Sequence, residues 1–347
     1  MSRRFAVLLP VLAAVLLGLL SGCEPRSRTE QLTLAGRTMG TTWSVVVAAP
    51  DPALDAASLE TALAERLVEI NALMSTYDPD SELSRFNAAP AGEWFEVHPE
   101  LLEVLEIARE LAALTDGALD VTIGPLVNLW GFGAAPGERR VPDDAAIADA
   151  LASSGFDRLA LRSAPPALRK AGALYVDLSA IAKGYAVDEL AELLDEAGVE
   201  RYLVEIGGEI RVRGRNARGV PWQVGIERPD ASRRAVARTA IGLETGAVAT
   251  SGDYRNFFSV DGVRYSHTID PSTGRPVSHD VASVTVIHPS AAWADGWATA
   301  LNVLGAERGL AVAQARGLPV SFTRYDGDLL TDSVSPDFRP FLDRNEP

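Results

Sequence analysis

The second half of the chain is dominated by short strand-forming segments joined by turns, and this pattern restricts the fold more than any other feature. One of these turns, Asp261-Gly262, is a residue pair typical of a two-residue β-hairpin. Strands in tandem hairpins, interleaved with helices, indicate an α+β fold rather than a parallel, doubly wound sheet. The predicted strands of this half are residues 201–206, 209–214, 222–227, 257–266, 281–288 and 319–331.

Helices are predicted where apolar residues recur at helical spacing. Residues 57–74 show this spacing, and residues 99–117 begin with proline and end with glycine, as helices often do. Further helices are predicted at 143–155, 185–198 and 291–305, and one more strand at 41–49. There is no internal repeat and no linker long enough to divide the chain. We therefore expect an α+β fold with mixed or antiparallel sheets flanked by helices.

The first residues read as an export signal. Arg3 and Arg4 precede an apolar run that is short for a membrane-spanning helix and contains Pro10, so residues 1–22 are interpreted as a signal peptide. Residues 20–23, LSGC, resemble a bacterial lipobox, in which the cysteine is lipidated and becomes the new N-terminus. Cys23 is the only cysteine in the 347 residues, which favours a lipid anchor over a free exposed thiol. The alternative is an ordinary cleaved signal with a chance cysteine.

Residues 23–34 are then the lipidated cysteine and a polar tether. We expect a bacterial lipoprotein that faces the periplasm, and we take the inner membrane as its location, although Glu24 does not decide between the two membranes. Because residues 1–22 contain two arginines and no acidic residue, their removal takes the formal net charge from −15 to −17. This charge argues against nucleic-acid binding. It does not exclude an anionic ligand, since a few local cations or a metal ion can outweigh it.

Asp295 and Thr299 are candidates for a metal site. They stand four residues apart in a predicted helix, so a carboxylate and a hydroxyl share one face. A small set of oxygen ligands suits Mg²⁺, which keeps bound waters and takes further ligands from phosphates. The alternative is a structural helix in which Trp293, Trp297 and Leu301 pack inward while Asp295 is solvated.

Other polar motifs fit either a ligand site or a purely structural role. Asp177 ends a strand-like run and Lys183 starts a helix, which suits a phosphorylated ligand or a helix cap with a surface lysine. His267 lies in a loop rich in turn-forming residues, and Gly207-Gly208 makes a tight bend or a close backbone approach to a ligand. Residues 117–133 combine glycines with an aromatic residue, a composition that can line a pocket for a flat ring. No Walker loop, G-x-G-x-x-G, G-x-S-x-G or H-E-x-x-H motif occurs.

Taken in order, eight motifs closely resemble those of the ApbE family, exported FAD:protein FMN transferases that are often lipoproteins. The match runs from Met39 to the C-terminal strands, and several ordered motifs at matching spacing are far more specific than any one of them. The resemblance implies a single transferase domain over residues 35–343, with the FAD site between two closely packed subdomains. The motifs are MGTTW, MSTYDPDSELSRFN, GALDVTIGPLVNLWGFG, DLSAIAKGYAVD, IGGEIRVRG, SGDYRNFF, SHTIDPSTGRPV and ADGWATALNVLG.

The resemblance also implies the residues of the site. The family's Mg²⁺ ligands match Asp295, Thr299 and Ala180, and because Ala180 has no donor side chain, its carbonyl oxygen is the expected ligand. Tyr77 matches a tyrosine that stacks on a ring of FAD. Relatives can carry an acidic residue at position 183, so Lys183 is a departure there. In sequence order, the FAD-contacting positions match Met39, Tyr77, Ala118, Leu119, Asp120, Asp177, Lys183 and Ile269.

The implied reaction moves FMN from FAD, the substrate, onto a Thr or Ser hydroxyl of a partner flavoprotein and releases AMP. Mg²⁺ at Asp295 and Thr299 neutralises the pyrophosphate in this scheme, and His267 is the expected base because its unperturbed pKa lies near neutrality. The family's acceptors are flavin-bearing subunits of membrane redox complexes with a D-x-x-(S/T)-G-A-(S/T) motif. Two alternatives stay open: an Mg²⁺-dependent FAD pyrophosphatase, and a lipoprotein that binds FAD without catalysis.

Overall fold

The computed structural model describes residues 31–134, 137, 139–227, 237–252, 256–327 and 329–342. The predicted signal peptide, the predicted lipidation site Cys23 and residues 24–30 of the predicted tether lie outside the described residues. The tether was predicted to extend to residue 34, but residues 31–34 belong to the first strand, because their backbone pairs with the next strand of the sheet. Within the described ranges, no helix is both long enough and apolar enough to cross a membrane.

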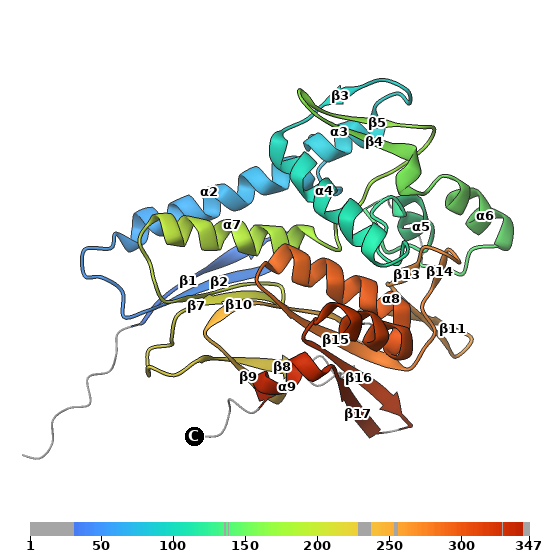
Figure 1. The fold of residues 1–347 in the computed structure, drawn as a ribbon. Coiled ribbons are helices and arrows are strands. Elements are labelled where there is room, and N and C mark those ends of the chain that lie inside the picture. The colour runs from blue at the N-terminus through green and yellow to red at the C-terminus, as the bar shows by residue number, and fades with distance from the viewer. Residues whose placement is uncertain are drawn as a thin grey trace, which may run out of the picture.

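An eight-stranded sheet forms the centre of the molecule (Figure 1). Its strand order is β1-β2-β6-β7-β10-β15-β16-β17, and each neighbouring pair is antiparallel, so the expected α+β architecture built on hairpins is confirmed. In β15, seven of eight residues are buried, because both faces of the sheet are covered there. The strands are β1 (Gln31–Thr38), β2 (Thr41–Ala48), β6 (Tyr202–Ile206), β7 (Glu209–Arg213), β10 (Thr245–Gly252), β15 (Val281–His288), β16 (Val320–Asp326) and β17 (Leu329–Val334).

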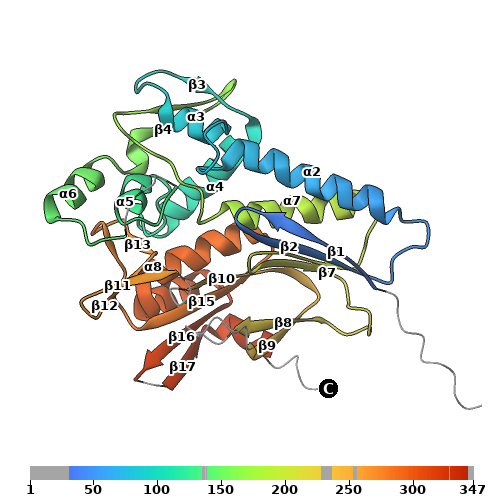
Figure 2. The same ribbon diagram turned by 180° about the vertical axis from the view of Figure 1, so that it is seen from behind.

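Three helices, α2 (Ala56–Met74), α7 (Ala182–Glu196) and α8 (Ala291–Arg316), cover one face of this sheet (Figures 1 and 2). In α2, the buried residues recur every three or four positions, which is the apolar face expected of a helix on a sheet. The α8 element is longer than its predicted range. It consists of two helical segments, because Gly305 has a left-handed φ of 74° that interrupts the helix.

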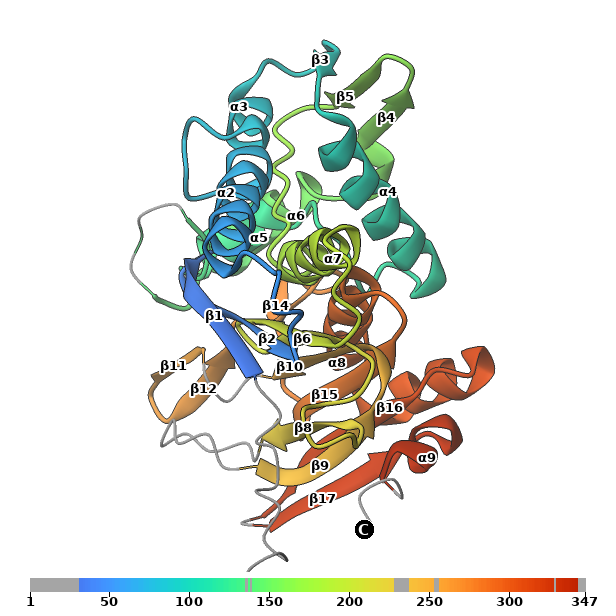
Figure 3. The same cartoon turned by 90° about the vertical axis from the view of Figure 1, so that its left-hand side faces the viewer.

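The other face of the sheet is covered by the hairpin of β8 (Trp222–Glu227) and β9 (Ala237–Leu243), and by α9 (Arg339–Leu342) (Figure 3). An apolar cluster fills the space between them, with Trp222, Val224 and Ile241 packed near Val212 and Val248 of the sheet. A second hairpin, β11 (Phe257–Val260) and β12 (Val263–Ser266), turns at Asp261-Gly262 as predicted. A third pairs β13 (Ile269–Asp270) with β14 (Arg275–Pro276).

The remaining elements stand beyond the helical layer, at the top of Figure 1. They are α3 (Glu82–Ala88), β3 (Phe95–Glu96), α4 (Pro99–Leu114), α5 (Gly124–Leu129), α6 (Asp144–Ala152), β4 (Leu159–Ser163) and β5 (Pro166–Lys170), with short 3₁₀ turns at Phe156–Arg158 and, near α9, at Pro336–Phe338. Many of their buried residues, such as Phe86 and Leu105, belong to the same apolar cluster as Val45 and Val204 of the sheet, whereas Leu126 of α5 and Ile147 of α6 belong to a smaller separate cluster.

Besides the end of α8, three predicted helix boundaries differ from the structure by three residues. Helix α6 ends at Ala152 rather than at Gly155. Helix α4 ends at Leu114, before the predicted Gly117, because the Thr115 hydroxyl donates to the Leu111 carbonyl at 2.7 Å and Asp116 and Gly117 both have left-handed φ. Helix α7 begins at Ala182 rather than at Tyr185. Lys183 and Gly184 are therefore inside the first turn of this helix.

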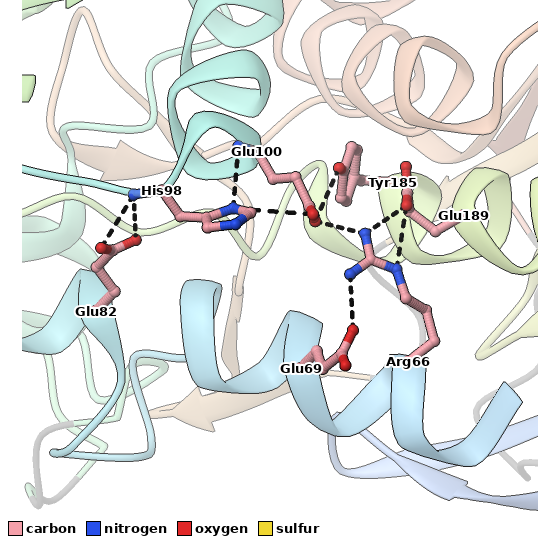
Figure 4. Close-up of polar contacts among 7 residues, drawn as sticks. All are labelled: Arg66, Glu69, Glu82, His98, Glu100, Tyr185 and Glu189. Atoms are coloured by element: carbon pink, nitrogen blue, oxygen red, sulfur yellow. Dashed lines mark hydrogen bonds and ion pairs between the residues drawn. The ribbon is translucent and has the colours of Figure 1, made fainter. Parts of the chain in front are cut away.

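A cluster of charged side chains connects α2, α4 and α7 (Figure 4). Arg66 of α2 pairs with Glu69 at 3.1 Å, with Glu100 of α4 at 2.5 Å and, through Nε at 3.2 Å, with Glu189 of α7. The Tyr185 hydroxyl donates to Glu100. Burial lowers the pKa of Arg66, but the surrounding carboxylates outweigh burial and raise it. This cluster fixes the three helices whose far ends approach the cavity described next.

Candidate active site

A cavity of about 800 Å³ lies between the sheet and the segment that leads into α5. This volume falls within the range typical of small-molecule and cofactor sites. The FAD site expected between two packed parts of the fold corresponds in position to this cavity. Eleven of the residues predicted from the sequence line it: Tyr77, Ala118, Leu119, Asp120, Asp177, Ala180, Lys183, His267, Ile269, Asp295 and Thr299.

Met39 is the predicted FAD contact that does not line the cavity. It forms the two-residue turn between β1 and β2 together with Gly40, and both residues have positive φ, 46° and 71°. Gly40 and Thr41, its neighbours, do line the cavity. Met39 is half-buried and packs against the main core.

Two segments far apart in the sequence run side by side along one wall. The Asp177 amide donates to the Val121 carbonyl at 2.8 Å, and Ile123 and Tyr175 form a parallel bridge. In each segment, the aspartate accepts from the amide two residues ahead, Asp120 from Thr122 and Asp177 from Ser179, at 2.8 Å each. These local turns fix both carboxylates at the cavity wall. Burial raises the pKa of Asp120, and the hydrogen bonds from Thr122 oppose this.

The crossing of α7 and α8 sets the position of the predicted metal ligands. At Gly184, a Cβ atom would lie 2.2 Å from the Ala291 carbonyl oxygen, so only glycine allows this approach. Asp188, one turn further along α7, accepts hydrogen bonds from the amides of Ala291 and Ala292, the first residues of α8, at 2.9 and 3.0 Å. These hydrogen bonds fix α7 against the start of α8, where Ala291 lies four residues before Asp295.

Asp295 is 5% exposed, so the alternative of a solvated side chain is wrong. Its Oδ2 accepts from the Gly184 amide at 3.1 Å and lies 3.9 Å from the Lys183 ammonium, while among the described residues Oδ1 receives no hydrogen bond. Burial raises the pKa of Asp295, Lys183 opposes this increase, and Glu209 adds to it. Trp297 and Leu301 are buried on the same helix, as the alternative expected, so α8 has a packing face and a cavity face.

Lys183 is not a surface lysine. Its ammonium lies 2.7 Å from Oε2 of Glu209, the first residue of β7, whose side chain is 4% exposed. Burial lowers the pKa of Lys183, but Asp295 and Glu209 outweigh burial and raise it, so the side chain is charged at neutral pH.

His267 presents one ring nitrogen for chemistry. Its Nδ1 lies 3.1 Å from the Asn256 carbonyl oxygen, and because a carbonyl only accepts, Nδ1 carries the proton and Nε2 is left as the basic atom. Burial lowers the pKa of His267 to about 4, and Lys183 and Arg139 add to this against the Asn256 hydrogen bond. The sequence argument assumed a pKa near neutrality. The structure corrects that assumption, and His267 is neutral throughout the physiological range.

Several lining residues were not found from the sequence. Glu205, Glu209 and Glu227 lie in strand-like stretches, where alternating charges indicate a solvated face, and no signal shows that these carboxylates converge. Gly207-Gly208 forms the tight turn between β6 and β7, as one interpretation expected, and it also lines the cavity, while its close approach to a ligand stays a prediction. In residues 117–133, Phe132 lines the cavity, whereas Trp130 is 1% exposed and belongs to the core.

The charge of the cavity bears on the ligands it can hold. Among its described lining residues, six carboxylates face one lysine: Asp120, Asp177, Glu205, Glu209, Glu227 and Asp295 against Lys183. Within the described chain, no group of three or more His, Cys, Asp or Glu side chains is arranged to hold a metal ion by itself. Asp295, Thr299 and Ala180 line this cavity, and their expected donors are the carboxylate, the hydroxyl and the Ala180 carbonyl. This set fits Mg²⁺, which completes its coordination with water and phosphate oxygens.

Comparison with known proteins agrees with the fold and the cavity. The sequence model of the ApbE family matches residues 39–322, so the chain belongs to the ApbE family. A protein of Vibrio cholerae serotype O1 named FAD:protein FMN transferase is 47% identical over 338 residues, 97% of this chain and 99% of the relative. The Escherichia coli K12 protein of the same name is 39% identical and covers 92% of this chain and 93% of its own length.

A solved structure described as the flavin transferase ApbE from Vibrio cholerae superposes with a TM-score of 0.83 at 47% identity, covering 90% of this chain and all of that one. The expected ApbE-like fold is thereby confirmed.

Proposed function

We propose that this protein is an Mg²⁺-dependent FAD:protein FMN transferase that attaches FMN to a Thr or Ser hydroxyl through a phosphoester bond and releases AMP. The observation that carries the proposal is the cavity, where eleven residues from distant motifs of the family converge. The names of its relatives, with which it aligns over nearly its whole length, support the same activity.

The reaction is a substitution at phosphorus. The acceptor hydroxyl attacks the phosphorus on the FMN side of the FAD pyrophosphate, a new P–O bond forms, and the P–O bond to the AMP phosphate breaks. Asp295, Thr299 and the Ala180 carbonyl would hold Mg²⁺, which supplies positive charge to the pyrophosphate and the departing AMP. Such transfer depends mainly on positioning and charge stabilisation.

His267 accepts the hydroxyl proton at Nε2 in this proposal. The pKa of His267 is about 4. The base is therefore unprotonated at neutral pH. In protein kinases, an aspartate likewise accepts the proton of an attacking hydroxyl. Tyr77 is 70% exposed at the cavity, so its ring is free to stack on a flat ligand ring.

The export and partner assignments complete the proposal. Residues 1–22 are a lipoprotein signal peptide, Cys23 is lipidated, and the tether between Cys23 and the start of β1 at Gln31 holds the transferase domain near the periplasmic side of the inner membrane. The acceptors are flavin-bearing subunits of membrane redox complexes with a D-x-x-(S/T)-G-A-(S/T) motif. Mass spectrometry of the N-terminal peptide from bacterial membranes tests the anchor, because a lipidated Cys23 gains acyl mass and a plain signal leaves none.

One incubation separates the three candidate functions. The purified protein is mixed with FAD, Mg²⁺ and a peptide that carries the acceptor motif, with an EDTA-treated sample beside it. We expect the peptide to gain one FMN group, AMP to appear in equal amount, and EDTA to abolish both. Free FMN and AMP with an unmodified peptide would establish the pyrophosphatase, and intact FAD would establish a binding protein. Transfer that persists in EDTA would refute the role of Mg²⁺.

A further inference from the structure

Glu209 is a buried carboxylate that neither the sequence motifs nor the proposed reaction assigns to a task. It begins β7, directly after the Gly207-Gly208 turn, and its side chain is 4% exposed. Its Oε2 is fully buried, and among the described residues the Lys183 ammonium is its only close polar partner. The ammonium of Lys183, 2.7 Å away, is the charge that compensates it. An uncompensated carboxylate at this depth is strongly unfavourable, so Glu209 holds the lysine in place.

The same ammonium also faces Asp295, the candidate metal ligand. Lys183 Nζ lies 3.9 Å from Oδ2 of Asp295 and is closer to Glu209. The 2.7 Å contact with Glu209 is short enough for a hydrogen bond and the 3.9 Å separation from Asp295 is not, so Glu209 anchors the ammonium although Asp295 also attracts it strongly. The Gly184 amide occupies Oδ2 of Asp295, which leaves Oδ1 open to the cavity.

A divalent cation and an ammonium compete for one carboxylate, because each lowers its negative potential and they repel each other. We infer that Glu209 is a positioning residue, which holds Lys183 away from Asp295 and so keeps Asp295 available to a divalent metal ion. This inference rests on the proposed metal site. A lysine beside a metal ligand would normally repel the metal ion and weaken its binding. Pairing with Glu209 accounts for the presence of Lys183 at this position.

Binding of Mn²⁺ to the full chain, with FAD present and acceptor absent, tests this inference. Free Mn²⁺ is counted by its EPR signal, and chromatography checks that FAD stays intact. In Glu209→Gln, Lys183 loses its nearer partner and moves to Asp295, so we expect Mn²⁺ affinity to fall by about ten-fold or more. In the double variant Glu209→Gln with Lys183→Met, the competing ammonium is gone, and affinity returns to within about two-fold of the wild type.

Two further variants separate the possible causes. Glu205→Gln removes another cavity carboxylate, one that accepts from the Gly208 amide and does not pair with Lys183, so its effect on affinity should be clearly smaller. If Glu209→Gln stays weak in the Lys183→Met background, Glu209 acts on the metal directly and the inference is wrong. Unchanged affinity in Glu209→Gln also refutes it. Asp295→Asn tests the metal site itself. If this variant binds Mn²⁺ normally, the proposed metal site is wrong. If it loses Mn²⁺ binding while Glu209→Gln has no effect, the metal site stands and only the role of Glu209 is refuted.

Discussion

Replacing Gly184 by alanine tests how strictly the crossing of α7 and α8 determines both stability and chemistry. The added Cβ would lie 2.2 Å from the Ala291 carbonyl oxygen and 2.8 Å from the Cα of Ala292. A carbon and an oxygen normally approach to about 3.3 Å, so the two helices must separate by about 1 Å. Both obstacles are backbone atoms, and no side chain can rotate away to make room.

The expected loss of stability follows from two opposing terms. Alanine in a helix interior is favoured over glycine by about 1 kcal/mol. Overpacking against a rigid neighbour costs about 3 kcal/mol, the upper part of the usual range. The variant should therefore be less stable by about 2 kcal/mol. With a urea m-value of about 3 kcal/mol per molar, the unfolding midpoint falls by about 0.7 M.

The same shift should affect catalysis, because α7 carries Lys183 and α8 carries Asp295 and Thr299. A displacement of about 1 Å in a catalytic site typically costs about a hundred-fold in rate, so FMN transfer should fall by that order. Gly137→Ala is the matched control, since a Cβ there meets no atom within 4 Å. A Gly184→Ala protein with an unchanged or raised urea midpoint and normal transfer would show that the crossing tolerates a methyl group, against our argument.

Three further predictions concern single side chains. Tyr77→Ala should weaken FAD binding by up to about ten-fold while Tyr77→Phe leaves it nearly unchanged, as measured by flavin fluorescence titration; equal losses in both variants would argue against ring stacking. The pKa of His267 is about 4 in the folded protein, against about 6.5 in the unfolded chain. As the pH falls below 6.5, the imidazole is protonated in the unfolded chain first, so the free energy of unfolding decreases by up to about 3 kcal/mol between pH 6.5 and 4. Urea unfolding at several pH values should show a smaller decrease in His267→Gln, and an identical pH dependence would contradict the burial of a neutral imidazole. Arg66→Met leaves the largely buried carboxylates of Glu100 on α4 and Glu189 on α7 without their cation and should destabilise the fold by about 2–3 kcal/mol. Arg324→Met, at an exposed pair, should cost clearly less, and similar thermal shifts in both variants would refute this difference.

The sequence predicted the architecture because its strongest signals are local. The hairpin at Asp261-Gly262 and the apolar spacing of α2 each follow from a few adjacent residues, and both appear in the structure. The prediction ended this helix at Gly305 and missed the second helical segment, which runs on to Arg316, because an isolated glycine in a helical pattern does not show whether it ends a helix or divides one.

The ordered motifs predicted which residues belong to the candidate site. How those residues are arranged became clear only from the folded structure. The approach of Val121 to Asp177 and the pairing of Lys183 with Glu209 join segments that no local pattern connects. The pKa of His267 likewise depends on burial by neighbours from several elements. Burial and long-range pairing are properties of the assembled core, so residue spacing alone does not predict them.

The carboxylate of Asp188 at the start of α8 has a consequence for anion recognition. In many nucleotide-binding proteins, the free amides and positive dipole of a helix start attract a phosphate. Here Asp188 takes the first amides of α8, and Asp295 takes the Gly184 amide in the first turn of α7. The amides at the starts of both helices therefore bind carboxylates of the protein itself. Because six carboxylates and one lysine line the cavity, we expect a metal-complexed dinucleotide to be a better ligand than the bare polyanion.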